Sequence, residues 1–288
     1  MNILIAKVGN IRVNEIKALA EELNKKHKVT ICSMAEEAGY RGLAFSYRDV
    51  PIRVVPLLYK DILKNSTWVE NRSIKFLKET SKNFDDVAAY EFTSQPADAI
   101  SVMLCEIMAH KPPDLVICGI SNGAHMGQHV YTSSNIGMAM EAAFLGTKVI
   151  AVGVDEKIGG NSEDELKPVA EFISKNVEKF VKLKLPPHTF LNINIPTVAK
   201  YKDLKGIKVA RMSRLNQPSK YIERLDPKGE KYYWADRVTR TNADPSEEFG
   251  RTWFDKGYVT IVPINYDSTD YDAINDWNSK IKTNGGEQ

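Results

Sequence analysis

The chain has 288 residues, enough for one large domain or two small ones with a buried core. Its 39 Lys and Arg residues against 37 Asp and Glu residues give a net charge of +2, which argues against a nucleic-acid partner. The three cysteines lack a CxxC spacing, which favours buried free thiols over disulfides or a zinc site. Together with the lack of a membrane-length apolar run, this predicts a cytoplasmic protein.

The first half of the chain alternates between strand-like and helical patterns. Residues 2–6 form a short apolar run typical of a strand buried on both faces, and residues 13–23 place their apolar side chains on one helical face. For residues 61–93 the pattern suggests one or two amphipathic helices. Further strands are expected at 28–32, 50–55, 114–118 and 148–154, and helices at 96–108 and 136–145. This alternation predicts a largely parallel, doubly wound sheet.

The second half has a different character. A long amphipathic helix at 166–183 precedes an alternating strand at 189–195. Asp226 and Gly229 bracket a turn signal between two short β-like runs, which indicates a hairpin. Short β-like runs occur at 207–211, 221–224, 231–234 and 258–262, and a terminal helix is expected at 270–281.

Ligands of an open parallel sheet bind beyond the carboxyl ends of its strands. That rule selects the loops at 6–11, 33–46 and 119–135. The third loop ends in Ser133-Ser134-Asn135 directly before a helix, where backbone N–H groups and hydroxyls suit an anion. A plain N-cap is the alternative explanation. The sequence contains neither a dinucleotide fingerprint after the first strand nor a Walker A lysine motif nor a G-x-S-x-G elbow.

The chain resembles the SurE family of survival-protein nucleotidases, which are metal-dependent phosphomonoesterases. The matching stretches cover nearly the whole chain and keep their order. They are residues 1–5, 16–20, 96–98, 113–120, 137–146, 191–196, 205–209, 226–229, 232–234 and 257–263. The resemblance implies an α/β fold with a three-layer, Rossmann-like, mostly parallel sheet, a C-terminal β-hairpin arm and a terminal helix. It also implies a homodimer or homotetramer that exchanges the arm or the tail.

The same resemblance suggests a division of the chain into two parts. Residues 1–196 would form the Rossmann-like α/β core. Residues 197–288 would form a C-terminal extension with the β-hairpin arm, a strand that returns to the core and an oligomerisation tail.

The family's active-site pattern does not carry over. Its first loop reads Asn-Asp-Asp-Gly with both aspartates on a divalent metal such as Mg²⁺ or Mn²⁺, whereas this chain has Lys7-Val8-Gly9-Asn10. The family's serine ligand falls at or near Gly39, its asparagine ligand is Ser121 here, and a second asparagine is replaced by His125. Only part of the phosphate site survives, as Ser133-Ser134-Asn135. Because such ions prefer several oxygen ligands with a carboxylate among them, we expect no metal cofactor.

These differences give one leading hypothesis, a pseudoenzyme of the nucleotidase family that retains a phosphate or nucleotide ligand. Lys7 would supply the positive charge that the family takes from its metal. The alternative is that Lys7 is a solvated loop lysine. The candidate ligand-binding residues are Lys7, Asn10, Ser121, Asn122, Ser133, Ser134 and Asn135.

Two further functions remain open. One is an active phosphatase or 5'-nucleotidase that hydrolyses nucleoside monophosphates by a rearranged or metal-free site. The metal-free form would use His125, four residues before His129, as acid, base or nucleophile. A homo-oligomeric interaction protein without a ligand would instead use aromatic residues of the hairpin region as its interface. These aromatic residues are Tyr221, Tyr232, Tyr233, Trp234 and Trp253.

Overall fold

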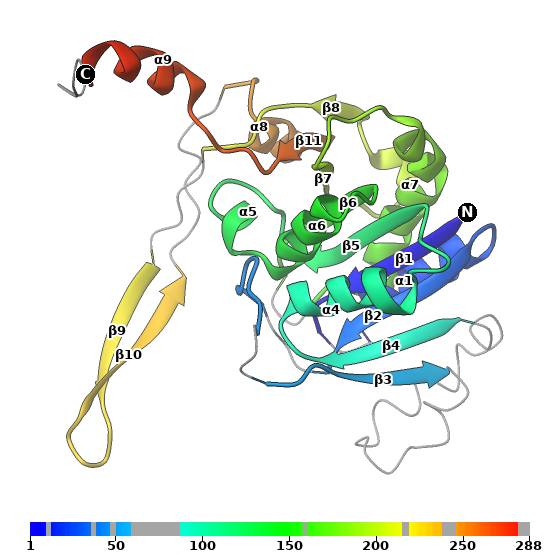
Figure 1. The fold of residues 1–288 in the computed structure, drawn as a ribbon, viewed down its shortest axis with the longest axis horizontal. Helices are drawn as coiled ribbons and strands as arrows, with labels where there is room; N and C mark the ends of the chain where they lie inside the picture. Colours follow the sequence, from blue (N-terminus) through cyan, green and yellow to red (C-terminus); the bar gives the residue numbers. More distant parts are fainter. Residues whose placement is uncertain are drawn as a thin grey trace, which may run out of the picture.

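The computed structural model describes residues 1–9, 13–35, 39–46, 50–58, 87–157, 160–214, 219–237 and 246–281. Nine of its strands form one sheet (Figure 1). They are β1 (Asn2–Lys7), β2 (Lys28–Met34), β3 (Arg53–Leu58), β4 (Ala88–Thr93), β5 (Leu115–Asn122), β6 (Val149–Val154), β7 (Thr189–Ile195), β8 (Ile207–Val209) and β11 (Val259–Asn265). Their order across the sheet is β3-β4-β2-β1-β5-β6-β7-β11-β8. The pairs β3–β4 and β7–β11 are antiparallel and the other neighbours are parallel.

Helices cover both faces of this sheet. The helices that the structure describes are α1 (Asn14–Asn24), α4 (Pro96–Val102), η2 (Met103–Ile107), α5 (His129–Thr132), α6 (Ser134–Phe144), α7 (Glu163–Lys182), η3 (Tyr201–Asp203), α8 (Gly250–Asp255) and α9 (Tyr271–Lys280). One apolar core lies between the sheet and the pair α1 and α7, and a second lies between the sheet and α4, η2 and α6. The three-layer, mostly parallel α/β fold expected from the sequence is therefore confirmed.

The side chains of β1 alternate between the two cores, so this one short strand contributes to both. Ile3 and Ile5 point into the core of α1 and α7, while Leu4 and Ala6 point into the core of α6. All four side chains are fully buried. A continuous apolar run, without polar residues between, is what a strand covered on both faces requires.

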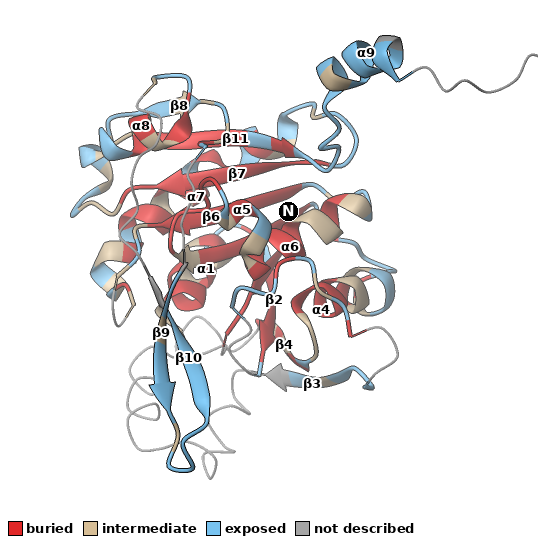
Figure 2. Cartoon of the chain, turned by 90° about the vertical axis from the view of Figure 1, so that its left-hand side faces the viewer, coloured by how far each residue is buried: buried red, intermediate tan, exposed pale blue. Residues whose placement is uncertain are grey.

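The hairpin arm and the terminal helix stand apart from this layered body. Strands β9 (Ser219–Leu225) and β10 (Lys231–Arg237) form a separate antiparallel sheet. At their turn the Asp226 N–H donates to the Glu230 carbonyl at 2.9 Å, and Gly229 adopts a φ of 85°. Figure 2 shows that the arm and α9 are exposed over most of their length. In the described ranges, no helix is both long enough and apolar enough to cross a membrane.

The structure corrects two expectations. Residues 88–93 form β4, parallel to β2, rather than part of a helix, because pairing with β2 on one side and β3 on the other supplies hydrogen bonds to their extended backbone. The rest of that helical prediction, residues 61–86, lies outside the described residues. Cys32 and Cys118 are buried free thiols as expected, but Cys105 is exposed because it lies on the outer side of η2.

Candidate functional site

Three loops selected from the sequence meet at the carboxyl edge of the sheet. The Val8 N–H donates to Asn135 Oδ1 at 3.2 Å, which joins the first loop to the start of α6. The Arg41 N–H donates to Ser134 Oγ at 2.9 Å, which joins the second loop to the same helix. The Met34 N–H in turn donates to the Gly9 carbonyl at 3.3 Å. The segments before and around α6 are thus tied to both loops by hydrogen bonds.

The start of α6 carries three polar residues that the sequence had singled out. Ser133 is the N-cap, and its Oγ accepts the Ile136 N–H at 3.4 Å. Ser134 and Asn135 are buried. Because Ser133 Oγ and Asn135 Oδ1 both act as acceptors, the Ser133 hydroxyl hydrogen and the Asn135 amide group keep donors for a ligand. An 11-residue helix adds its positive N-terminal field, so this edge suits an anion.

The second loop packs directly on α5 and α6 at two glycines. A Cβ atom on Gly137 would lie 2.0 Å from the Gly42 carbonyl oxygen. A Cβ atom on Gly42 would lie 2.7 Å from the Tyr131 carbonyl oxygen, and Gly42 also has a φ of 54°. The two backbones approach so closely that a side chain at either position would push the loop away from the helix. This contact fixes the second loop beside the start of α6.

Lys7 is buried at the end of β1, with 8% of its surface exposed, and so is not a solvated loop lysine. Strand alternation puts its Cβ on the face of Ile3 and Ile5, opposite to the face of Val8. Its Nζ donates to the Val8 carbonyl at 3.2 Å, so the ammonium group turns to the end of the strand. Ser33, fully buried, is its cross-strand neighbour. The Lys7 charge therefore lies at the carboxyl edge, reached from the α1 side.

The side chain of Asn122 holds the loop after β6. Its Oδ1 accepts the Lys157 N–H and the Asn161 Nδ2 group, each at 2.9 Å. Its Nδ2 donates to the Lys157 carbonyl at 2.9 Å. These bonds engage both ends of its carboxamide. Ser121, half-buried, instead lies opposite Gly153 in the pairing of β5 with β6.

His125 is buried, with 2% of its surface exposed, and two asparagines of β7 clamp its backbone. The His125 N–H donates to Asn194 Oδ1 at 2.7 Å, and the Asn192 amide donates to the His125 carbonyl at 2.8 Å. Asn192 and Asn194 are not among the site residues expected from the sequence. The sequence did contain a signal for them: two asparagines on one face of an otherwise apolar, buried strand need hydrogen-bond partners, which indicates a polar contact at that strand. Of the remaining candidates, Asn10 lies outside the described residues.

The residues at the end of β1 do not fit a divalent metal ion. Val8 is aliphatic and buried, Gly9 has no side chain, and the Lys7 ammonium lies at the same strand end. Mg²⁺ and Mn²⁺ prefer a set of oxygen ligands that includes a carboxylate. Elsewhere in the described ranges, no three His, Cys, Asp or Glu side chains gather closely enough to hold an ion.

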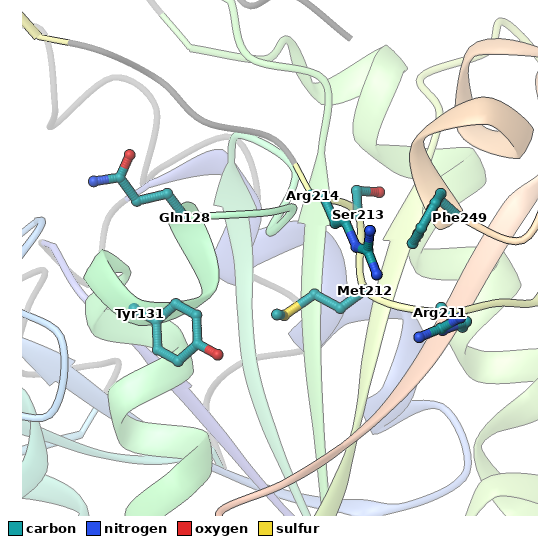
Figure 3. Close-up of a pocket in the computed structure, with 7 residues that line it drawn as sticks. All are labelled: Gln128, Tyr131, Arg211, Met212, Ser213, Arg214 and Phe249. Carbon is teal, nitrogen blue, oxygen red and sulfur yellow. The ribbon is translucent and has the colours of Figure 1, made fainter. Parts of the chain in front are cut away.

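A cleft that the sequence did not reveal lies beside α5, next to the start of α6. Its volume is about 550 Å³. Figure 3 shows the seven residues that line it, which come from three separate segments of the chain. They are Gln128, Tyr131, Arg211, Met212, Ser213, Arg214 and Phe249.

Comparisons with known proteins give relatives that match most of the chain. A relative named 5'-nucleotidase SurE from Syntrophobacter fumaroxidans is 27% identical over 282 residues, covering 96% of this chain and 100% of the relative. Another of that name, from Alkaliphilus metalliredigens, is 32% identical over 188 residues, covering 65% of this chain and 72% of the relative.

Structural comparison gives the same fold. The crystal structure of a SurE protein from Aquifex aeolicus superposes with a TM-score of 0.72 at 22% identity, and the match covers 98% of this chain and 100% of the other. The sequence profile of the family described as "Survival protein SurE" matches residues 3–218. With that match extending from β1 to the segment before the hairpin arm, the chain belongs to the SurE family.

Proposed function

We propose that this protein binds the phosphate group of a nucleoside monophosphate at the carboxyl edge of the sheet and does not hydrolyse it through a metal ion. The relatives' name, 5'-nucleotidase, supports the choice of ligand. The observation that carries the proposal is the donor set at the start of α6. Ser133 and Asn135 retain donors there, and the field of the helix favours a negative group.

The ammonium group of Lys7 would add a full positive charge to this edge. Lysine is an adequate point-charge partner for a phosphate group. The same charge opposes a metal ion, since two unit charges about 4 Å apart repel by roughly 4 kcal/mol at an effective dielectric constant of about 20. Metal-assisted hydrolysis needs an ion to activate water and to bind the phosphate oxygens. The residues at the end of β1 therefore favour binding over catalysis.

Substitution of Asn135 by aspartate tests the anion site without removing the contact to the first loop. Asn135→Asp keeps an oxygen for the Val8 N–H but places a negative charge where phosphate would bind. We expect isothermal titration to show adenosine 5'-monophosphate binding weakened by about tenfold or more, which is ~1.4 kcal/mol. Asn275→Asp makes the same chemical change in exposed α9 and should leave the affinity unchanged. Equal affinity in both variants, or no binding by the native protein, would contradict the proposed site.

Hydrolysis needs a separate measurement in the same protein. The rate of phosphate release from adenosine 5'-monophosphate should stay at background with Mn²⁺ and after EDTA. A micromolar Mn²⁺ site in a titration would overturn the proposed loss of the metal. The substitution Val8→Asp, which restores one aspartate of the family pattern, should recover some Mn²⁺ binding. A second aspartate at Gly9 is a poorer restoration, because Gly9 has a φ of 107°, where a side chain is strained.

A metal-free phosphatase built on His125 would give a different result. It would release phosphate in the presence of EDTA, and His125→Ala would abolish that release. The burial of His125 favours the binding function instead, since an acid or base must reach the substrate oxygen.

We further propose that the extension at residues 197–288 assembles copies of this chain. The arm and α9 expose large aromatic side chains, and such residues are enriched at protein interfaces. The exposed fractions of Tyr221, Trp234 and Trp277 are 64%, 64% and 58%. Such an assembly is compatible with the phosphate site, because the arm and α9 project from the layered body (Figure 1).

A further inference from the structure

The cleft beside α5 has the size and chemistry of a small-molecule site. Its volume of about 550 Å³ lies in the size range of small-molecule sites, and the cleft is open to solvent on one side. On one wall, α5 contributes Tyr131. On the other, residues Arg211–Arg214 follow β8, and Phe249 caps the start of α8 (Figure 3). The mechanism of phosphate binding proposed above does not use any of these residues.

Two arginines are held against one aromatic ring in this cleft. The guanidinium carbon of Arg211 lies 5.8 Å from the centroid of Phe249, and that of Arg214 lies 5.6 Å from it. Phe249 itself is buried, with 4% of its surface exposed, so its ring acts as a fixed support. A guanidinium group that stacks on a ring keeps the N–H donors at its edge for a ligand.

The charge of the cleft is positive. Arg211 pairs with Glu248 at 3.2 Å, but both side chains are about two-thirds exposed, and such a pair is weak. Within the part of the chain that the structure describes, Arg214 makes no ion pair. Tyr131 is 62% exposed, and Figure 3 shows its phenol oxygen turned toward the space in front of Met212. Arginine and tyrosine both donate hydrogen bonds, so the group that fits between them is an anion.

The wall of the cleft formed by α5 directly precedes the start of α6 in the chain. Helix α5 has four residues and so rises only ~6 Å. The Ser133 N–H donates to the His129 carbonyl at 2.9 Å, which folds the N-cap of α6 directly onto α5. Tyr131 is therefore in the turn that directly precedes Ser133, the N-cap of α6.

We propose that this cleft is a second anion subsite, and that the ligand is a nucleotide with two separate phosphate groups. One phosphate would lie at the start of α6, and the other between Arg214, Arg211 and Tyr131. This inference rests on the proposed function, because the first phosphate occupies the site described there. It adds the class of ligand, a nucleoside bisphosphate rather than a monophosphate.

The test compares two probes on the intact protein. Isothermal titration should show adenosine 3',5'-bisphosphate binding at least about tenfold more tightly than adenosine 5'-monophosphate, which corresponds to ~1.4 kcal/mol. In Arg214→Gln that difference should disappear while the monophosphate affinity stays within about twofold. Tyr131→Phe, which removes only the hydroxyl, should reduce the difference in part. Arg224→Gln on the exposed arm is the matched control and should keep the full preference.

The outcomes separate this inference from the function on which it rests. Monophosphate binding without any preference for the bisphosphate overturns the second subsite and leaves the first standing. Equal weakening of both probes in Arg214→Gln also overturns it, since the residue would then act on the fold or on the first site. Binding of neither probe removes both proposals. Inorganic phosphate is also titrated into protein that is already saturated with the monophosphate. If it binds there and Arg214→Gln abolishes that binding, the second subsite takes a free phosphate ion, and the bisphosphate proposal is overturned.

Discussion

Asn122, Asn135 and Asn194 use their carboxamides to fix backbone segments at the carboxyl edge of the sheet. Each is held by hydrogen bonds rather than by apolar packing, and each joins segments distant in sequence. A carboxamide can accept and donate at once, which suits a position between two loops. The loops around the candidate site therefore start from a fixed geometry, which lowers the entropic cost of ordering them around a ligand.

A single methyl group on α6 tests the close approach of the second loop. Gly137→Ala would place Cβ 2.0 Å from the Gly42 carbonyl oxygen, so the loop must move. We expect the free energy of unfolding to fall by about 1–3 kcal/mol, the usual cost of overpacking, in a urea titration.

Gly39→Ala provides the matched control in the same loop. A Cβ atom on Gly39 meets no atom within 4 Å, so stability should change by no more than about 0.5 kcal/mol. If Gly137→Ala were as stable as the native protein, the close packing of loop and helix would be wrong.

At the scale of elements, the start of α7 is held by a capping box. Glu165 accepts the Ser162 N–H at 3.0 Å and the Ser162 hydroxyl at 2.9 Å, and it also pairs with Lys157. The hydrogen bond from Lys157, followed by those from Ser162, lowers the pKa of Glu165 from its ordinary value of 4.5 to about 2. The carboxylate thus links α7 to the segment that Asn122 also holds.

This lowered pKa predicts a defined dependence of stability on pH. A carboxyl group with a depressed folded pKa stabilises the fold above its unfolded value of 4.5, and the effect is lost as the pH falls toward about 2. Glu165→Gln keeps a capping side chain but removes the charge. The difference in free energy of unfolding between the native protein and this variant should be constant above about pH 5.5 and shrink steadily below pH 4.5.

Chemical denaturation at several pH values measures that difference. Glu178→Gln makes the same chemical change at an exposed position in the last turns of α7 and is the matched control. If the difference in free energy of unfolding between the native protein and Glu165→Gln stayed constant down to pH 3, the pairing of Glu165 with Lys157 would be contradicted.

At the scale of the whole molecule, the arm and α9 leave apolar surface without cover in a single chain. In the register of β9 with β10, Trp234 lies opposite Ile222, and its ring is 6.2 Å from that of Tyr232. A two-stranded hairpin is marginal by itself in water, so contacts with another copy would stabilise it.

Light scattering after size-exclusion chromatography tests this assembly. The native protein should have the mass of a dimer or tetramer of the 32.4 kDa chain. Trp234→Glu should shift that mass toward the monomer, because a charge cannot be buried in an apolar contact without a partner. Lys182→Glu, at an exposed position at the end of α7 in the layered body, should leave it unchanged. A native protein that elutes as a monomer at all concentrations would rule the assembly out.

The sequence alone determined the local elements whose residues lie close together along the chain. The apolar run of β1, the helical stripes of α1 and α7, and the turn of the hairpin each follow from a period or a turn signal within one segment. It also showed that Lys7-Val8-Gly9 carries no carboxylate, which needs no coordinates.

Only the tertiary structure decided which distant residues share a site. It turned Lys7 back to the Val8 carbonyl, buried His125 behind two asparagines of β7, and brought Arg214 opposite Tyr131. It also made residues 88–93 a strand, because pairing with β2 supplies hydrogen bonds that local propensity does not measure. Apart from the bond between the neighbours Lys7 and Val8, these contacts join residues tens of positions apart, so no periodicity encodes them. They form only when the packed sheet fixes the loops at its carboxyl edge.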